Sequence, residues 1–167
     1  MRKAIFIALL FSLVSANTYA QHIIAAFLEK HGKDESIELT NIGKKMFDAM
    51  EGQVIDDPKL SGIIAELDNI SIVKSTDAAF LQEYYNSASA IVTRTTDYIP
   101  IFTREGDEPL MVMIKQDDKV IKELIIISKR PTEFSLVYLG GNISMETLAD
   151  YSRTGSFDSL KNIIPDE

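Results

Sequence analysis

Four short segments rich in β-branched, aromatic and other apolar residues follow one another in the second half of this chain. They occupy residues 98–104, 110–115, 119–128 and 134–139. The breaks between them are only a few residues long and contain Gly, Asp or Pro. Connections this short join antiparallel neighbours, because a parallel pair needs a crossover of about a dozen residues or more. The sequence therefore predicts a C-terminal four-stranded meander.

One of these segments is apolar at four consecutive positions, 124–127, where the sequence reads LIII. A strand with one face in water alternates apolar and polar side chains, whereas a strand covered on both faces does not need to. We therefore expect this segment to lie in the centre of the sheet.

The first half of the chain mixes helical and strand patterns. Apolar residues recur at helical spacing in 22–31, after Thr40 or Asn41, from Pro58 to Leu67, and after Ser75 or Thr76. Residues 36–40 and 69–74 alternate as half-buried strands do. Gly140 to Asn142 ends the last strand, and Ser144 can cap a final helix.

These elements predict an α+β fold with a mainly antiparallel sheet and helices mostly on one face. Residues 21–153 form a single domain in this interpretation, and residues 154–167 form a loose C-terminal tail.

Residues 1–20 predict export. Arg2 and Lys3 precede an apolar run from Ala4 to Val14 that contains a single Ser, and Thr18-Tyr19-Ala20 offers small residues for cleavage before Gln21. This is the pattern of a signal peptide, and the run is too short for a comfortable membrane span. We expect a periplasmic or extracellular protein with no stable membrane insertion after cleavage.

Charge and cysteine content exclude several classes of function. Removing residues 1–20 from the 167-residue chain leaves 147 residues and shifts the formal net charge from −8 to −10, because two bases leave with them. A chain this acidic is unsuited to nucleic acid or anionic lipid. The chain has no cysteine, which excludes disulfides, thiol nucleophiles and cysteine zinc sites.

The order of elements resembles domain of unknown function family 4252, a set of small exported proteins of Gram-negative bacteria. The resemblance covers roughly residues 22–152. Its markers are Lys44-Lys45-Met46-Phe47, the Leu60/Ile63/Ile64/Leu67 helix with Leu67-Asp68, the segments 111–115 and 124–128, and Leu139-Gly-Gly-Asn-Ile143. The resemblance implies an envelope location and a link to envelope stress or signalling, and it assigns no functional residues.

Motifs for catalysis or metal binding are weak. His22 and His31 lie nine residues apart in one predicted helix, so at about 3.6 residues per turn they point in opposite directions. We expect each to have a surface or capping role. Asp56-Asp57, Asp107-Glu108 and Asp117-Asp118 lie in predicted connections without the spacing of a calcium loop. Ser71-Ile-Val-Lys74 crosses a strand instead of a helical turn. We predict no catalytic residue, no metal and no cofactor.

Three tyrosines are the candidate contacts to a ligand or partner, because tyrosine combines apolar area with a polar tip. They are Tyr84, Tyr85 and Tyr98.

The function we expect is a non-catalytic envelope binding or interaction module whose partner is another envelope protein. One alternative is a carrier of small apolar ligands. The other is a hydrolase that uses dispersed carboxylates, which a single sequence cannot reveal.

Overall fold

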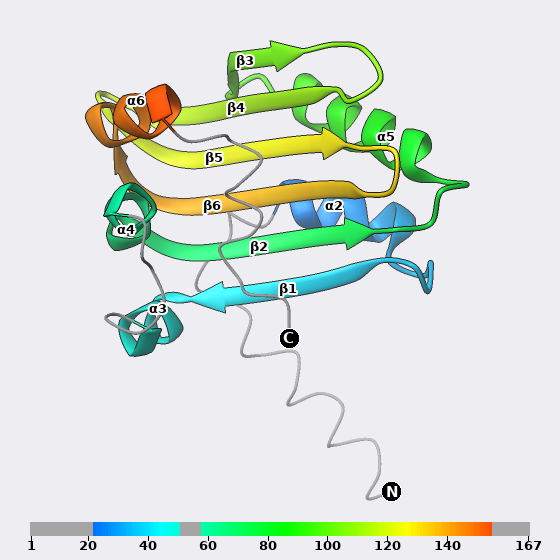
Figure 1. Cartoon of the computed structure of the whole chain (residues 1–167), viewed down its shortest axis with the longest axis horizontal. Helices are drawn as coiled ribbons and strands as arrows, with labels where there is room; N and C mark the ends of the chain where they lie inside the picture. The colour runs from blue at the N-terminus through cyan, green and yellow to red at the C-terminus, as the bar shows by residue number, and fades with distance from the viewer. Residues whose placement is uncertain (1–21, 51–57, 155–167) are drawn as a thin grey trace, which may run out of the picture.

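The segment predicted as central, now strand β5, is hydrogen-bonded to a neighbour on each side (Figure 1). The computed structural model describes residues 22–50 and 58–154. In this part of the chain a six-stranded sheet has the order β1-β2-β6-β5-β4-β3. The strands are β1 (Glu38–Gly43), β2 (Leu67–Ser75), β3 (Ile99–Arg104), β4 (Leu110–Asp117), β5 (Val120–Lys129) and β6 (Phe134–Ser144). Every adjacent pair is antiparallel, which confirms the α+β class and the C-terminal meander.

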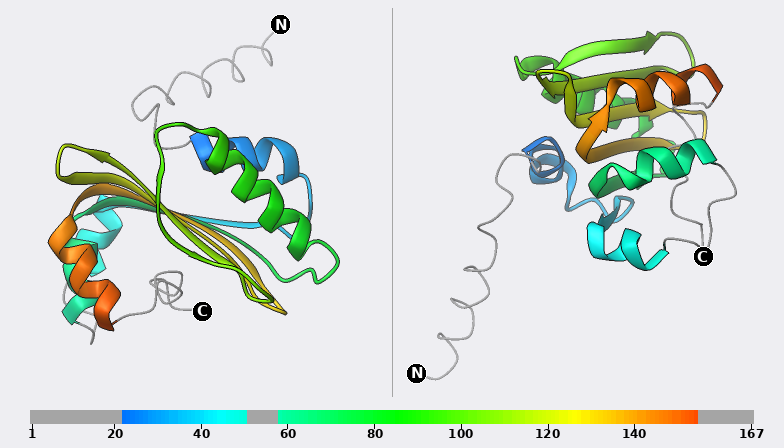
Figure 2. Two further views of the ribbon diagram at one scale, coloured as in Figure 1. Left: turned by 90° about the horizontal axis from the view of Figure 1, so that it is seen from above. Right: turned by 90° about the vertical axis from the view of Figure 1, so that its left-hand side faces the viewer.

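The helices cover both faces of the sheet, so the expectation that they lie mostly on one face is wrong. They are α2 (His22–His31), α3 (Lys44–Met50), α4 (Pro58–Ala65), α5 (Leu81–Arg94) and α6 (Met145–Thr154). Figure 2 shows α2 and α5 on one side, here called the α2/α5 face. Helices α3, α4 and α6 lie on the other side, here called the α3/α4/α6 face.

The physical reason for two covered faces lies in β5 itself. Leu124 and Ile126 belong to the buried cluster on the α3/α4/α6 face, whereas Ile125 and Ile127 belong to the cluster on the α2/α5 face. All four are at most 2% exposed. Since successive side chains of a strand point to opposite faces, four consecutive apolar residues require cover on each side.

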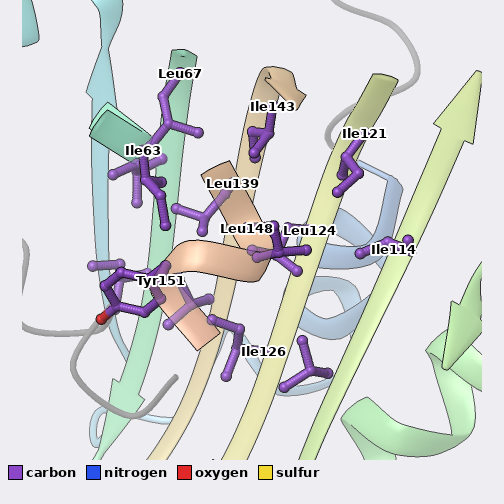
Figure 3. Packing of buried hydrophobic residues seen from close by; sticks show 14 of the residues in the cluster. Ile63, Leu67, Ile114, Ile121, Leu124, Ile126, Leu139, Ile143, Leu148 and Tyr151 are labelled. Carbon is purple, nitrogen blue, oxygen red and sulfur yellow. The ribbon is translucent and has the colours of Figure 1, made fainter. Parts of the chain in front are cut away.

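Each face has a core of its own. On the α3/α4/α6 face, Leu148 and Tyr151 of α6 and Ile63 of α4 pack with side chains of the central strands (Figure 3). On the α2/α5 face, Phe27 of α2 stacks on Phe134 of β6 with ring centroids 5.4 Å apart. The sheet is thus the middle layer of three.

Some predicted boundaries differ from those in the structure. Strand β1 runs to Gly43, so Thr40 and Asn41 pair with β2 instead of capping the next helix. Helix α4 begins at Pro58 as predicted, but Leu67, which continued its apolar stripe, starts β2. The apolar stripe misled here because a helix and a buried strand both need apolar residues at these positions.

Strand β6 continues through Gly140, Gly141 and Asn142 to Ser144, where the sequence predicted an end. Gly141 permits a close approach of two backbone segments, because a Cβ at this position would lie 2.3 Å from the carbonyl oxygen of Glu66. The N–H of Asn142 donates to that same oxygen at 2.9 Å.

The predicted cap of the final helix is confirmed, because Ser144 Oγ accepts the N–H of Thr147 at 3.0 Å.

Several predictions lie outside the described residues. These are the signal peptide at 1–20, the acidic pair Asp56-Asp57, and the predicted tail beyond Thr154. The structure leaves each of them as a prediction.

Candidate functional site

Of the three tyrosines predicted as contacts, Tyr84 lies in the core of the α2/α5 face. It is 1% exposed, and its hydroxyl donates to Asp34 Oδ2 at 3.1 Å while lying 3.2 Å from Ser36 Oγ. Burial raises the pKa of this hydroxyl. Tyr84 therefore connects α5 to the segment that follows α2, and its ring is covered.

His31, predicted to have a surface or capping role, is buried at 4% exposure, so that prediction is wrong. Its Nε2 lies 2.9 Å from Ser87 Oγ on α5, and its Nδ1 lies 3.7 Å from Asp34 Oδ2. Lys30 Nζ donates to Ser87 Oγ at 3.3 Å. The sequence carried no signal for this pair, because its members are 56 positions apart and meet only when α2 packs beside α5.

The Ser87–His31–Asp34 order is that of a hydrolase triad, but the setting of Ser87 differs. Ser87 lies in the interior of α5, where backbone N–H groups bond to carbonyls one turn earlier. Acyl transfer needs N–H donors free to bind the developing oxyanion. The serine is also buried. We therefore interpret this cluster as a polar connection between two helices.

A second polar cluster lies at the start of β3. The hydroxyl of Tyr98 donates a short hydrogen bond to Glu123 Oε2, and the carboxylate of Glu123 is buried. Lys115 Nζ lies 3.7 Å from Glu123 Oε1 and 3.2 Å from Asp97 Oδ2. Burial raises the pKa of Tyr98, and its hydrogen bond to Glu123 raises it further. These contacts fasten the beginning of β3 to its neighbour β4 and to β5, the next strand of the sheet.

Strand β3 forms one edge of the sheet, and all six of its residues are exposed. Three of them are large apolar residues: Ile99 is 47% exposed, Ile101 38% and Phe102 41%. Isolated apolar side chains on a surface are ordinary, whereas a group of them on an edge strand marks a surface suited to contact with another chain.

A β-bulge gathers two of these side chains on one face. Ile99 pairs with Ile114 and Phe102 pairs with Val112, with Ile101 inserted as the extra residue. Ile114 and Val112 both belong to the α3/α4/α6 core, and directly paired residues point to the same face. Residues three apart in a regular strand would point to opposite faces, so the bulge places Ile99 and Phe102 on the same side.

The opposite edge of the sheet is chemically different. Strand β1 is also largely exposed, but its exposed residues are mostly polar or Gly. Leu39, at 43% exposure, is the one large apolar side chain that β1 exposes. Of the two edges of the sheet, β3 is therefore the apolar one and β1 the polar one.

The far end of β3 leads into an acidic turn that contains Glu105, Asp107 and Glu108, all of them exposed. Gly106 adopts a φ of +112°, which an L-amino acid with a side chain rarely accepts. Burial raises the pKa of the half-buried Tyr85, and the charge of Glu105 raises it further, so α5 lies near this turn. Tyr85 and Tyr98 are thus associated with opposite ends of β3, whereas Tyr84 is not part of this surface.

Ile99, Ile101 and Phe102 were missed as contact residues in the sequence, although a signal was present. Pro100 lies among them, and proline within a strand indicates an edge position because it has no N–H to donate. That signal identifies β3 as an edge without showing how much of it stays uncovered.

Among the described residues, no group of three or more His, Asp or Glu side chains is arranged to hold a metal ion. In residues 22–50 and 58–154, no helix is long and apolar enough to cross a membrane.

The fold and this surface define an α+β domain with three layers and one exposed apolar edge strand. The chain belongs to the family described as domain of unknown function (DUF4252), which matches residues 30–151 and so includes β3. No curated protein and no solved structure matches the chain.

Proposed function

We propose that this protein is a non-catalytic interaction module of the cell envelope, and that it binds an extended segment of a partner envelope protein along β3. The observation that carries the proposal is the exposure of Ile99, Ile101 and Phe102 on an edge strand. An extended segment can add a strand to such an edge. Its main-chain hydrogen bonds then supply affinity, and its side chains supply specificity.

The way β3 is held supports binding to a preformed edge. Tyr98, just before the strand, bonds to the buried Glu123. At the other end, Arg104 Nε donates to the carbonyl oxygen of Glu108 at 3.0 Å. A strand fixed at both ends loses little conformational freedom when a partner binds, so less of the interaction free energy is spent on ordering it.

Pro100 limits where the new ladder can form. It has no N–H, so β3 cannot donate a ladder hydrogen bond at this position. We therefore expect main-chain pairing chiefly along 101–104, with Ile99 contributing apolar contact. A short ladder together with a few apolar contacts is typical of a regulated, reversible interaction.

The two alternatives lack a comparable observation in the described residues. A carrier of small apolar ligands would need a cavity, whereas the exposed apolar residues of β3 lie on a sheet edge. A hydrolase with dispersed carboxylates would need acids that converge in a cleft with raised pKa values. Glu123 is the buried carboxylate of this region, and it is bonded to Tyr98 and near Lys115.

The test is site-specific photocrosslinking in cells that export the protein. A photoreactive amino acid is placed at position 101 on β3 or, as the matched control, at position 40 on β1. Both positions are exposed on edge strands. We expect position 101 to give one discrete product in which mass spectrometry maps the crosslink to an extended segment of the partner.

A second variant separates docking from folding. Phe102→Lys should abolish the crosslink from position 101 while circular dichroism and the melting temperature stay close to those of the parent, because Phe102 is exposed. Equal crosslinking from positions 40 and 101, or a product that persists in the Phe102→Lys background, would overturn the proposal.

A further inference from the structure

We infer that the segment bound along β3 runs antiparallel to it and carries basic residues immediately before its apolar part. This inference rests on the proposed function and names the chemistry of the partner. It comes from a difference in charge between the two ends of β3.

The C-terminal end of β3 is acidic. The turn that follows Arg104 contains Glu105, Asp107 and Glu108, all exposed. The positive charge of Arg104 does not offset the negative charge of the whole turn, because one base faces three acids. The Nε of Arg104 also donates to the backbone of that same turn. A segment that passes this end lies beside an excess of negative charge.

Other charges at this end of the sheet are farther from β3. Lys129 ends β5, where its N–H donates to the carbonyl oxygen of Pro109 at 3.1 Å, and Arg130 and Glu133 lie in the turn that follows. Strand β4 separates β5 from β3, and two strand spacings amount to roughly 10 Å. That is about one Debye length at 0.1 M salt, so the turn at 105–108 dominates for a segment on the outer edge.

Beside the N-terminal end of β3 the nearest charges balance one another, and the exposed acids Asp117 and Asp118 lie farther along the β4–β5 hairpin. Asp97 is paired with Lys115, which also lies near Glu123. Arg94, at the end of α5, is exposed. A partner segment therefore gains little from charge at this end, and the asymmetry can select its direction.

Antiparallel pairing is the direction we infer, because every strand pair in this sheet is antiparallel and such pairs are slightly more stable per residue than parallel ones. In that direction the part of the segment beside 105–108 is the part before its apolar residues. Basic residues there would lie next to the acids.

A second copy of this chain fits the edge less well. Asp97 is the charged residue that most closely precedes β3. In a two-fold antiparallel pair it would approach the acidic turn of the other copy. Each copy would also contribute Pro100, so the shared ladder would lack one donor from each side. Both chains carry a net negative charge, which adds repulsion.

The test uses three synthetic peptides with blocked ends and the same central Val-Thr-Val-Thr-Val. One has Lys-Lys before this core, the second has Lys-Lys after it, and the third has Glu-Glu before it. Fluorescence anisotropy with the purified protein gives each Kd at low and at high salt. We expect the first peptide to bind about three- to tenfold more tightly than the second at low salt, the effect of a few exposed ion pairs, with the difference lost at high salt.

Protein variants complete the design. Glu105→Gln with Asp107→Asn should remove the preference for the first peptide. Asp117→Asn with Asp118→Asn, in the hairpin beyond the other end of β3, should leave it intact. Each double substitution removes two exposed negative charges. A general change in the net charge of the protein therefore cannot account for a difference in peptide preference between the two variants.

The outcomes separate the two claims. Tighter binding of the second peptide would overturn the direction, and equal binding of all three would overturn the charge selection while leaving the edge as the binding surface. Failure of all three to bind a folded protein would count against the proposed function itself. A dimer in analytical ultracentrifugation that Phe102→Lys dissociates would assign the edge to a second copy and overturn the inference.

Discussion

The hydroxyl of Tyr98 donates a hydrogen bond to the carboxylate of Glu123, which joins the start of the exposed edge strand to the buried interior of β5. The bond crosses β4, because β3 and β5 are not neighbours in the sheet. It ties the apolar edge to a strand that is buried on both faces, so the geometry of the proposed binding surface depends on a buried pair.

Replacing Tyr98 with Phe tests that dependence. The variant removes the hydroxyl donor and leaves the buried carboxylate of Glu123 with Lys115 as its remaining partner at 3.7 Å. A buried acceptor that loses its donor costs about 1–3 kcal/mol. Urea denaturation at pH 7 should show a loss of this size, and Glu123→Gln in the same background should recover part of it. A loss below about 0.5 kcal/mol would mean that the bond contributes little.

The alkaline stability of the protein should also depend on Tyr98. Its folded-state pKa is raised, first by burial and then by the bond to Glu123, and burial also raises the pKa of Tyr138. The unfolded chain releases these protons near pH 10 while the folded chain keeps them. The free energy of unfolding should therefore be steady below about pH 9 and fall as the pH rises above about 10.

The measurement is a series of urea melts between pH 7 and 11, with tyrosinate absorbance recorded in parallel. Tyr98→Phe should be less stable than the parent at pH 7 but should lose less stability per pH unit above pH 10. Parallel curves for the two proteins would show that Tyr98 titrates alike in the folded and unfolded chains.

The connection between α2 and α5 gives a third prediction. Ser87→Ala removes the partner of His31 Nε2 at 2.9 Å and leaves a buried ring nitrogen without that bond. We expect a loss of about 1–3 kcal/mol in the free energy of unfolding. Thr93→Ala on the exposed side of the same helix is the control, with an expected change within about 0.5 kcal/mol.

The same residue tests our interpretation of the cluster as structural. A fluorophosphonate probe labels activated serine nucleophiles, and it should leave the purified protein unmodified. Labelling that disappears in Ser87→Ala would identify an activated serine. The cluster would then be catalytic, and our interpretation of it as a connection between helices would be wrong.

Sequence patterns predicted the features of this fold that arise locally. The short connections between 98 and 139 gave the meander, and the four apolar residues at 124–127 gave the central strand with both faces covered. Pro58 and Ser144 gave helix starts through their own backbone chemistry. In each case the signal and the structure involve residues close together in the chain.

The features that sequence patterns missed arise from contacts between distant segments. The burial of His31 depends on Ser87, 56 positions away, and the role of Tyr98 depends on Glu123, 25 positions away. The run 124–127 indicated that β5 is covered on both faces, but which helices cover which face depends on packing between segments that are distant in the sequence. The exposed edge was missed for the same reason, because strand order decides which apolar strand remains uncovered.

Export gives a fourth prediction, based on the sequence of residues 1–20. Mass spectrometry of protein recovered from outside the cytoplasm should find the N-terminus at or near Gln21. Replacing Ala20 with a bulky residue such as Phe should slow processing, because signal peptidase reads small side chains there. A terminus at Met1 on a membrane-embedded product would contradict the export prediction.

The last prediction compares the centre of the sheet with its edge through the same substitution. Ile126 is 2% exposed on the α3/α4/α6 face, so Ile126→Ala removes methyl groups from a packed core and leaves a cavity. The expected loss in the free energy of unfolding is about 2–5 kcal/mol. Ile99→Ala, at 47% exposure, should cost less than about 1 kcal/mol by the area it buries. Denaturant melts of the two variants decide the matter: similar losses would mean that Ile99 is packed as a core residue, and the exposed apolar edge on which the proposed function depends would then not exist in solution.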